Sequence, residues 1–462
     1  MLIQPPPEDR EARRAEVEAF LNAHPDVQYL DAIVCDMNTV VRGKRYPRAD
    51  IVHLFETGML MPYSVMVLDV TGTSSDAGGI GFSDGDPDGV LHPVPGTLVM
   101  VPWADVPTAQ VLMSHDINHG PSALLEPRNV LAQVERRLRA DGFHPNVAVE
   151  LEFYLLDAER TPERFPQAPI SPGTGERDNT TQVYGMVELD DYAQVLRDIE
   201  DACHVQNIPA YTASSEYAPG QFEINLRHGP SAVAAADSAA LLRRVVGNIA
   251  KRHGFRASFM AKPFLDLAGN GLHVHLSLLN ANGHNLFAEA SGDPVSHPAL
   301  RHGIGGLQAA LWQSMAIFAP NVNAYRRFRP NIYVPMAPSW GINNRSLAFR
   351  IPAGAAANRR IEHRISGADA NPYLVLAAVL AGAHYGVTRA IDPGPPSTGN
   401  AGAEQDPAMP RTLEEALAVF ADAGILPDYF GQTYLDVYRQ TKQAELEAFR
   451  DYISGREYDW YL

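Results

Sequence analysis

The sequence predicts an α+β protein with a small N-terminal domain, residues 1–115, and a large C-terminal domain, residues 116–462. Short strand-like segments separated by turn residues fill the first part of the chain, and longer amphipathic segments with helical spacing are spread through the second. No internal repeat is visible. The chain of 462 residues is long enough for two or three domains, at roughly 100 to 200 residues each.

The N-terminal part begins with an amphipathic segment, residues 8–24, that predicts a helix. The alternating or apolar runs after it predict a small unit of strands and loops, with a Gly- and Asp-rich loop over residues 72–89. The strand-like segments are residues 27–36, 40–47, 64–70, 96–103 and 109–116.

The C-terminal part mixes strands with longer helices, predicted over residues 127–142, 193–206, 233–253, 302–318, 371–390, 413–420 and 434–453. The longest apolar stretch, Pro372 to Val387, includes His384 and is shorter than a membrane span. We therefore expect a buried helix there and no membrane partner.

Charge and cysteine content argue against several classes of function. The formal net charge is −17, whereas a nucleic-acid-binding protein normally carries a basic surface. Cys35 and Cys203 lie far apart in the sequence and suggest neither a disulfide framework nor a zinc site. The first residues are charged where a signal peptide would need an apolar run. These features predict a cytoplasmic protein with no nucleic-acid partner.

Five strand-like segments of the C-terminal part carry their charged residues on one face. Side chains two positions apart on a strand point to the same side, so Glu150 and Glu152 share a face in VAVELEFYL. The corresponding polar residues of GQFEINL, GLHVHLS, SLAFRIP and RRIEHRIS, with the preceding Glu216, are Gln221, Glu223, Asn225, His273, His275, Ser277, Arg350, Arg360, Glu362 and Arg364.

The residue types on this face indicate its chemistry. An ordinary exposed antiparallel sheet would mix Lys, Thr and Ser on its polar face, but here Glu, His and Arg predominate and Lys is absent. Carboxylates are the ligands that Mg²⁺ prefers, Mn²⁺ also accepts imidazole, and arginines bind phosphate and carboxylate oxygens in bidentate fashion. The pattern therefore predicts phosphoryl transfer at a polynuclear metal site.

At these residues the chain resembles the glutamine synthetase family, type I, over nearly its whole length. The matching segments, in the family's order, are VELEF, SSEYAPGQFE, FMAKP, GNGLHVHLS, NAYRRF, NNRSLAFRIP and RRIEHRISGADANPYL. The resemblance implies a β-grasp-like N-terminal domain and a large catalytic domain whose antiparallel sheet, packed by helices, carries the metal site. It also implies a homo-oligomer, a dodecamer of stacked rings with active sites between subunits.

The same resemblance assigns roles to individual residues. It implies two or three Mg²⁺ or Mn²⁺ ions per site, with ligands Glu152, Glu216 and Glu223 for the first and Glu150, His273 and Glu362 for the second. The implied glutamate-binding residues are Gly269, Arg327 and Arg364. The implied ATP-binding residues are His275, Ser277, Arg345, Arg350 and Arg360, of which Arg345 steadies the transferring phosphoryl group.

The implied reaction has two steps. ATP phosphorylates the γ-carboxylate of glutamate, and an amine then attacks the acyl phosphate to give a γ-glutamyl amide. Two departures from the family pattern bear on this amine. Tyr333 stands where ammonia-using members carry a glutamate in a flap, and a neutral phenol is a poor trap for ammonium. Asp69 can match the family aspartate that reaches the neighbouring subunit's ammonium site, but its segment, LDVTGTSSD, is altered.

This pattern is similar to that of γ-glutamylpolyamine synthetases, and it predicts putrescine, cadaverine, spermidine or spermine as the amine, in polyamine breakdown. Candidates for lining the entrance are Glu56, Asp84, Asp86 and Trp340. A monoamine such as ethanolamine or an alkylamine is the alternative, and ammonia is a third. A catalytically silent sensor of nitrogen metabolites would instead lack metal ligands or phosphate-binding arginines, and all of them are present.

Overall fold

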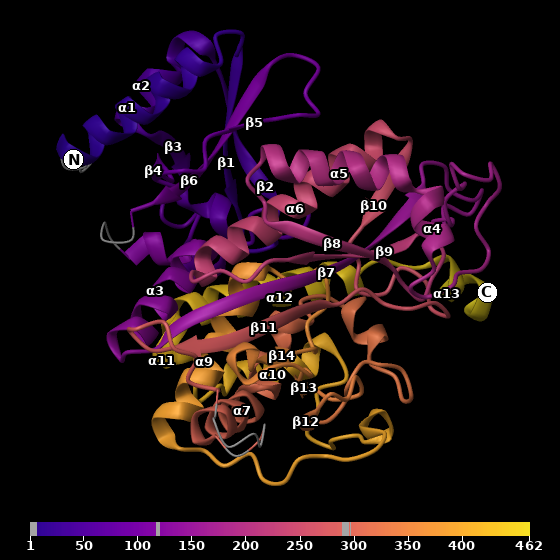
Figure 1. Ribbon diagram of the computed structural model, residues 1–462. Helices are drawn as coiled ribbons and strands as arrows, with labels where there is room; N and C mark the ends of the chain where they lie inside the picture. The colour runs from indigo at the N-terminus through magenta and orange to yellow at the C-terminus, as the bar shows by residue number, and fades with distance from the viewer. Residues whose placement is uncertain (1–6, 117–120, 289–294, 296) are drawn as a thin grey trace.

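The computed structural model describes residues 7–116, 121–288, 295 and 297–462, and its two sheets occupy separate parts of the chain (Figure 1). The first sheet lies within residues 29–115 and the second within residues 144–363. Both carry helices at their sides, which confirms the predicted α+β class. The domain boundary predicted after residue 115 falls between the sheets and stays a prediction.

The N-terminal sheet has the strand order β2-β1-β6-β4-β3, with β5 paired to β6. β1 and β6 are parallel, and the other described pairs are antiparallel. Helices α1 (Pro7–Ala23) and α2 (Ile51–Thr57) pack against each other beside this sheet. Its strands are β1 (Tyr29–Cys35), β2 (Val41–Pro47), β3 (Met59–Pro62), β4 (Asp88–Pro93), β5 (Val99–Met100) and β6 (Thr108–His115).

The second sheet has the order β12-β13-β14-β11-β7-β9-β8, with β10 paired to β7. Its pairs are antiparallel, as predicted, except that β12 and β13 are parallel. The strands are β7 (His144–Asp157), β8 (Ala210–Ser215), β9 (Gln221–Leu226), β10 (Phe255–Ser258), β11 (Leu272–Leu279), β12 (Trp340–Ile342), β13 (Phe349–Ile351) and β14 (Ile361–His363).

Helices cover the apolar face of this second sheet. Val149, Leu151 and Phe153 alternate with the glutamates of β7 and are fully buried, and α3 and α6 pack against this strand. The opposite face is thereby left to carry the polar side chains. The longer helices are α3 (Pro127–Ala140), α5 (Ala193–Val205), α6 (Ala232–Arg252), α7 (Pro298–Ala310), α9 (Pro372–Arg389), α10 (Leu413–Ala421) and α12 (Gln432–Arg450).

Helix α9 is the buried helix predicted from the apolar stretch. Almost all of its residues from Pro372 to Gly386 are buried, and it packs against α7 and α3. Among the residues that the structure describes, no helix combines the length and apolarity needed to cross a bilayer. The shorter helices are α4 (Met186–Asp191), α8 (Met315–Phe318), α11 (Pro427–Phe430) and α13 (Gly455–Tyr461).

Two sequence predictions of local structure were wrong. The helix predicted over residues 302–318 is interrupted after α7 by a 3₁₀ turn, Trp312–Ser314, before α8 begins. The indole Nε1 of Trp312 donates to Asp406 at 2.8 Å, a tertiary contact that the spacing of apolar residues does not reveal. The strand-like segment 64–70 forms a 3₁₀ helix, Tyr63–Val67, and the carbonyl of Leu68 accepts a bond from the Asn38 side chain.

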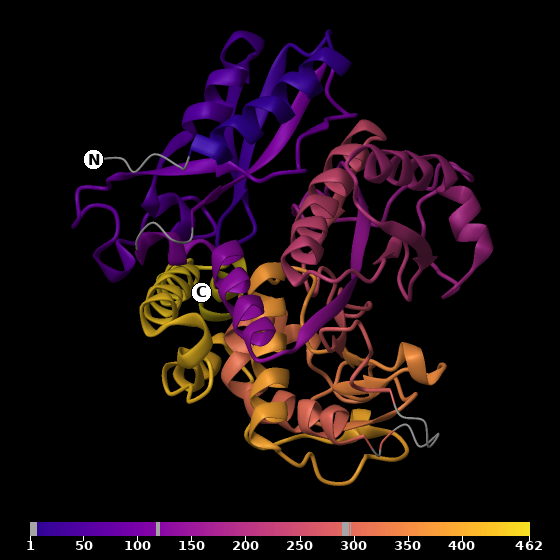
Figure 2. The ribbon, with the colours of Figure 1, turned by 60° about the vertical axis from the view of Figure 1, so that its left-hand side comes forward.

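Helix α12, near the C-terminal end of the chain, packs against the N-terminal part (Figure 2). Glu445 on α12 accepts hydrogen bonds from the Val70 amide at 2.9 Å and from the Asn38 side chain at 3.1 Å. Lys442 forms an ion pair with Glu445 at 2.9 Å, and both side chains are buried. The two N-terminal loops that carry Asn38 and Val70 are thus bonded to α12.

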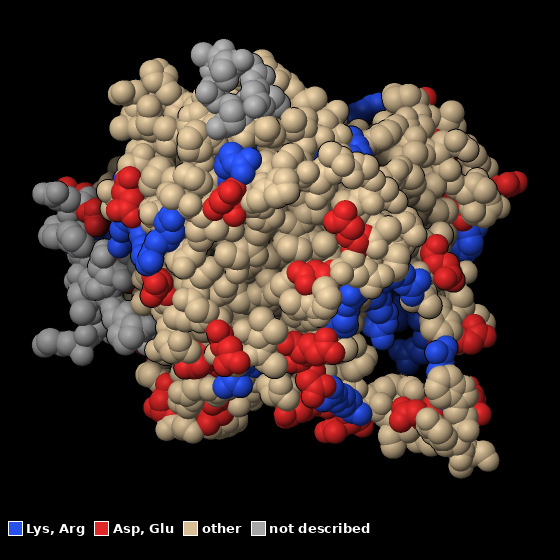
Figure 3. Space-filling view, turned by 90° about the horizontal axis from the view of Figure 1, so that it is seen from below, with Lys and Arg blue, Asp and Glu red and all other residues tan. Residues whose placement is uncertain are grey.

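Surface charge is unevenly distributed on this molecule. On the face seen in Figure 3, Lys and Arg side chains border a hollow, and Asp and Glu side chains lie on either side of this basic group. A recess bordered by basic side chains attracts anions. This local arrangement contrasts with the formal net charge of −17 of the whole chain.

Candidate active site

The second sheet places the charged residues of its central strands next to one another. Glu150 on β7 lies opposite His273 on β11, and Glu152 on β7 lies opposite Glu223 on β9. Neighbouring strands in a sheet are roughly 5 Å apart. Residues of the same face on adjacent strands therefore come within ligand distance of a common ion.

Two clusters of metal-ligating atoms result from this register. One ligand atom each from Glu150, His273 and Glu362 lie within 4.8 Å of one another, and so do atoms of Glu152, Glu223 and His273. The first cluster has the three residues predicted for the second metal. The second cluster has two of the three residues predicted for the first metal, with His273 in place of Glu216.

Glu216 follows β8 and lies beside these clusters without belonging to either. It is 9% exposed, and its main-chain N–H donates to the carbonyl of Gln221 across the β8–β9 turn. Burial, followed by the negative charge of Glu152, raises the pKa of Glu216 to about 8. The pKa of Glu223 is also raised well above its usual value, by burial and then by the charges of Glu150 and Glu152.

Burial and then the charges of the neighbouring carboxylates raise these pKa values, which is how carboxyl groups crowded into one site behave. The set fits a divalent cation, because Mg²⁺ and Mn²⁺ take carboxylate oxygens and Mn²⁺ accepts imidazole as well. When bound, such ions neutralise charge on a transferring phosphoryl group and orient its oxygens. The backbone of Gly271 lies close to these side chains. Its N–H donates to Glu152 at 2.6 Å, and a Cβ atom at position 271 would lie only 2.9 Å from His273 Nε2.

Glu362 is held by arginines on both of its oxygens. Arg350 on β13 lies opposite it in register and donates to Oε2 at 2.7 Å, and Arg364 donates to Oε1. Burial alone would raise the pKa of Glu362, but the charges of Arg364 and then His275 hold it at about 2. Glu362 is therefore a carboxylate at neutral pH.

The two histidines of β11 fix the position of Glu150. His275 Nε2 lies 2.8 Å from one carboxylate oxygen of Glu150, and His273 Nδ1 lies 3.3 Å from the other. Burial opposes ionisation of Glu150, yet the charges of His275 and His273 keep its pKa well below the usual value. Arg360 Nε contacts His275 Nδ1 at 3.0 Å and links this group to the edge of a cavity.

A cavity of about 500 Å³ opens over the charged face. The three arginines predicted to contact ATP, Arg345, Arg350 and Arg360, line this cavity together with His275. Their positive charge suits the binding of phosphate groups. The lining residues of the cavity are Glu150, Tyr184, Tyr211, Thr212, Ser214, Glu223, Asn225, His275, Arg345, Arg350, Pro352, Ala353 and Arg360. Ser277, predicted to lie at the nucleotide, does not line this cavity and donates to the carbonyl of Arg359 at 2.9 Å.

The residues predicted to hold glutamate lie together beside the metal clusters. Arg327 is 3% exposed and donates to the carbonyl of Ile365 at 2.7 Å. The loop residue Gly269 lies against it, since a Cβ atom at 269 would be 3.0 Å from the Arg327 side chain and 2.5 Å from the Ala261 carbonyl oxygen. The Nε atoms of Arg327 and Arg364 are buried without hydrogen-bond partners among the described residues. Two orphaned guanidinium donors fit an anionic ligand.

Tyr333 is 55% exposed and lies beside Tyr217. Its ring centroid is 6.0 Å from that of Tyr217, the residue after Glu216. The structure thus places Tyr333 beside the acidic cluster from a segment more than a hundred residues away.

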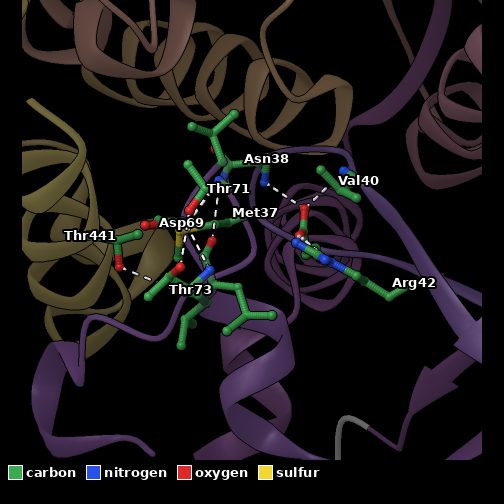
Figure 4. A network of polar contacts seen from close by, with 12 residues as sticks. Met37, Asn38, Val40, Arg42, Asp69, Thr71, Thr73 and Thr441 are labelled. Carbon is green, nitrogen blue, oxygen red and sulfur yellow. Dashed lines mark hydrogen bonds and ion pairs between the residues drawn. The ribbon is translucent and has the colours of Figure 1, made fainter. Parts of the chain in front are cut away.

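Asp69 lies in the N-terminal part and binds its own loop (Figure 4). Its Oδ1 accepts bonds from the Thr71 amide at 2.8 Å, the Thr71 hydroxyl at 2.7 Å and the Thr73 amide at 2.8 Å. Nearby, Asp36 binds the Val40 amide and Arg42, and Thr441 of α12 donates to the Val67 carbonyl. The role predicted for Asp69, in the site of a neighbouring subunit, stays a prediction.

The residues predicted to line an amine entrance lie in different parts of the structure. Trp340 is 1% exposed and its ring lies under Arg301, so it cannot line an entrance in this chain. Glu56 forms an ion pair with Arg14 at 2.7 Å near the N-terminus. Asp84 accepts bonds from the amides of Gly81 and Asp86 within its own loop.

Sequence reasoning missed two tyrosines of the cavity region. Tyr184 lines the cavity from a left-handed backbone conformation, φ 58°, and its amide donates to the Ser215 carbonyl at 3.1 Å. Tyr217 lies beside Tyr333. An aromatic residue directly after Glu216, in a turn where polar residues are usual, was the available signal for Tyr217. Nothing local marks Tyr184, because its place depends on the fold of the 158–185 loop.

Comparisons with known proteins agree with this geometry. Residues 124–461 match the family model described as glutamine synthetase, catalytic domain. The γ-glutamylputrescine synthetase of Escherichia coli is 40% identical over 449 residues, which cover 97% of this chain and 94% of that protein. A glutamate–isopropylamine ligase of a Pseudomonas species is 32% identical, with 83% of each chain covered. A γ-glutamylethanolamide synthetase of Streptomyces coelicolor is 29% identical, with 92% of this chain and 90% of that protein covered.

A solved structure has the same fold. The complex of GmaS with ADP superposes with a TM-score of 0.79 at 26% identity, covering 96% of this chain and 98% of that one. Enzymes of the matched family use ATP, divalent metal ions, glutamate and an amine or ammonia. With its acidic and histidine clusters and its arginine-lined cavity, the chain belongs to the glutamine synthetase family and is an ATP-dependent ligase that forms γ-glutamyl amides.

Proposed function

We propose that this ligase joins the γ-carboxylate of glutamate to a diamine or polyamine, with putrescine, cadaverine, spermidine and spermine as the substrate class. The observation that carries the proposal is Tyr333, which presents an exposed aromatic ring beside Tyr217, the residue that follows Glu216. A phenol there offers no fixed negative charge to capture ammonium, but its ring can contact an alkylammonium chain. The 40% identity to a γ-glutamylputrescine synthetase over 97% of the chain supports the same class.

The reaction runs in two steps that the arginines and the clusters of the charged face support. In the first, the γ-phosphoryl group of ATP is transferred to a γ-carboxylate oxygen of glutamate, which releases ADP and forms γ-glutamyl phosphate. Arg345, Arg350 and Arg360 line the cavity in which the triphosphate would lie, and their charges stabilise the transferring group. Arg327 and Arg364 hold the carboxylates of glutamate.

In the second step the amine nitrogen attacks the acyl carbon, the bond from that carbon to the phosphate oxygen breaks, and phosphate leaves. The nitrogen loses one proton, and the product is a γ-glutamyl amide. Mg²⁺ or Mn²⁺ would be held by Glu150, His273 and Glu362 in one cluster and by Glu152 and Glu223 in the other, with Glu216 nearby.

The assembly and location of the enzyme belong to the same proposal. Asp69 would act in the site of a neighbouring subunit, within a homo-oligomer built as a dodecamer of stacked rings. The cytoplasm supplies ATP and glutamate, and the two cysteines of the chain, Cys35 and Cys203, are free and buried, as is usual in a reducing compartment.

A monoamine is the second candidate substrate. Two relatives named above are a glutamate–isopropylamine ligase and a γ-glutamylethanolamide synthetase. Amine pockets differ by a few side chains, so this specificity can arise on the same scaffold.

A panel of amines tests the proposal directly. Purified protein with glutamate, ATP and Mg²⁺ is assayed for ADP formation with ammonium, ethanolamine, isopropylamine, butylamine, putrescine, cadaverine, spermidine and spermine, and products are identified by mass. We expect the highest kcat/KM with a diamine or polyamine. A higher kcat/KM for ammonium than for every diamine would contradict the proposal, and activity confined to monoamines would replace its substrate.

A further inference from the structure

Two exposed tyrosines contact each other, with tilted rings, beside the acidic cluster. Tyr217 is 52% exposed and Tyr333 is 55% exposed, and their ring centroids lie 6.0 Å apart at an interplanar angle of 40°. Large aromatic side chains gain free energy by burial. Two of them left half in solvent, from segments 116 positions apart, form a surface available to a ligand.

In the described parts of the chain no arginine or lysine stacks over either ring, although the charge of Arg345 acts on Tyr217 from nearby. Tyr211, on the neighbouring strand β8, differs because the guanidinium of Arg227 lies 5.0 Å from its ring centroid. The cation–π contacts that the structure contains elsewhere involve neither Tyr217 nor Tyr333. A cation from outside the chain can therefore occupy a place that an arginine takes at Tyr211.

The chain direction orders the site from inside to outside. Glu216 is 9% exposed and turns toward the carboxylates, whereas the next residue, Tyr217, is half exposed. A linear diamine entering this region would place one end near Glu216 and the acyl phosphate and the other end near the two rings. The two ends have different charge requirements.

The reacting nitrogen must be unprotonated to attack the acyl carbon, whereas the distal nitrogen of a diamine stays protonated near neutral pH because aliphatic amines have pKa values of about 10. A protonated amine over a tyrosine face is attracted by the ring quadrupole. The outer, aromatic part of the site thus suits the distal ammonium, and the inner, acidic part suits the reacting end.

We propose that Tyr217 is a specificity-determining residue that forms, with Tyr333, an aromatic surface for the distal ammonium group of a diamine or polyamine. This inference rests on the proposed function, since a monoamine has no second ammonium to bind. The two rings contact each other at a centroid distance of 6.0 Å, so the ammonium lies over their solvent-exposed faces and not between them. Substrates that lack the distal charge lose this contact.

Assays of two substrates with the wild type, Tyr217→Leu and Tyr217→Phe test whether this aromatic surface binds the distal ammonium. Putrescine and butylamine have the same carbon chain and differ by the distal ammonium. We expect Tyr217→Leu to lower kcat/KM for putrescine by about two- to thirtyfold, the range of one cation–π contact, and to change butylamine less than twofold. Tyr217→Phe keeps the ring and should retain the preference of the wild type for putrescine. KM for glutamate and for ATP should not change.

The controls separate this inference from the proposed function. Tyr452→Leu removes another tyrosine, 75% exposed beyond α12, and should leave both amines unaffected. If Tyr217→Leu lowers kcat/KM equally for putrescine and butylamine, Tyr217 has a merely structural role. If Tyr217→Phe loses as much kcat/KM for putrescine as Tyr217→Leu does, the hydroxyl and not the ring is recognised. Either result overturns the proposed aromatic surface. Failure of the wild type to use any diamine would instead overturn the proposed function itself.

Discussion

Arg350 on β13 and Glu362 on β14 lie opposite each other in register and form an ion pair of 2.7 Å. Glu362 is also a member of a metal-ligating cluster. The second carboxylate oxygen is bound by Arg364. Glu362 therefore joins the metal-ligating cluster to two arginines of the charged face.

Replacing Glu362 tests whether it supports both the fold and the metal. Glu362→Ala leaves two guanidinium groups without their partner at a position that is 1% exposed, so we expect the free energy of unfolding to fall by about 3–5 kcal/mol. Glu362→Gln keeps the volume and should unfold closer to wild type while still losing Mn²⁺ affinity. Calorimetric binding and chemical denaturation measure the two effects. Glu414→Ala, at an exposed ion pair with Arg450, is the control and should change neither.

Glu152→Ala should abolish turnover. Glu152 and Glu223 share a cluster with His273, and loss of one carboxylate removes a ligand of the cation that neutralises the transferring phosphoryl group. Turnover is measured as ADP formation, and Mn²⁺ binding by calorimetry. Normal activity in this variant would remove Glu152 from the metal site.

Arg345→Ala should slow phosphoryl transfer more than it weakens nucleotide binding. Arg345 lines the cavity, and a charge that acts on the transition state contributes on the order of 10³-fold or more to the rate. ADP binding, measured by calorimetry, should weaken far less than kcat falls. A loss confined to nucleotide affinity would assign Arg345 to binding alone.

Metal binding should release protons near neutral pH. Burial and the charge of Glu152 raise the pKa of Glu216 from an ordinary 4.5 to about 8, so it is largely protonated at pH 7 without metal. A cation favours the carboxylate form, and the metal affinity should rise with pH up to about 8. Calorimetry in buffers of different ionisation enthalpy counts the protons. Glu216→Gln should release fewer protons than the wild type when metal binds. Equal proton release would contradict Glu216 as the source of these protons.

The same shift gives the metal-free protein a pH-dependent stability with a defined sign. Between pH 4.5 and 8 the folded state holds a proton on Glu216 that the unfolded state has lost. The free energy of unfolding should therefore fall as pH rises through this window. In Glu216→Gln this part of the pH dependence should disappear in thermal denaturation curves recorded without metal.

Tyr333→Glu should shift the amine preference only in part. A carboxylate at this exposed position restores a charge that attracts ammonium, so kcat/KM for ammonium should rise. Tyr217 stays in place and Asp69 keeps its altered loop, so ammonium should not become the preferred amine. Steady-state assays with ammonium and putrescine measure the ratio, and an unchanged ammonium rate would separate Tyr333 from the amine site.

Strand alternation was the strongest local signal in this sequence. The alternation around Glu150 and Glu152 placed both on the polar side of β7, and the apolar residues between them are buried. The long helices were predicted to within a few residues wherever one face is apolar throughout, as in α5 and α6. Such patterns are readable because side-chain direction in a strand or helix follows from spacing along the chain.

The exceptions depend on contacts between distant segments. The helix predicted over 302–318 breaks where Trp312 binds Asp406, and segment 64–70 becomes a 3₁₀ helix where Leu68 binds Asn38. Trp340, an aromatic candidate for an exposed entrance, is buried under Arg301. In each case the partner lies 30 or more positions away, so no local pattern contains it.

The sequence by itself determined the charged face, its residue types and the phosphoryl-transfer chemistry that they predict, because each strand carries its own alternation. Only the tertiary structure decided which charges meet. The register of β7, β9, β11 and β14 gives His273 a place in both metal-ligating clusters. The turn after β8 leaves Glu216 beside these clusters and brings Tyr217 into contact with Tyr333. Strand neighbours and loop positions are set by the packing of the whole chain, since the free energy of burial is shared among segments far apart in sequence.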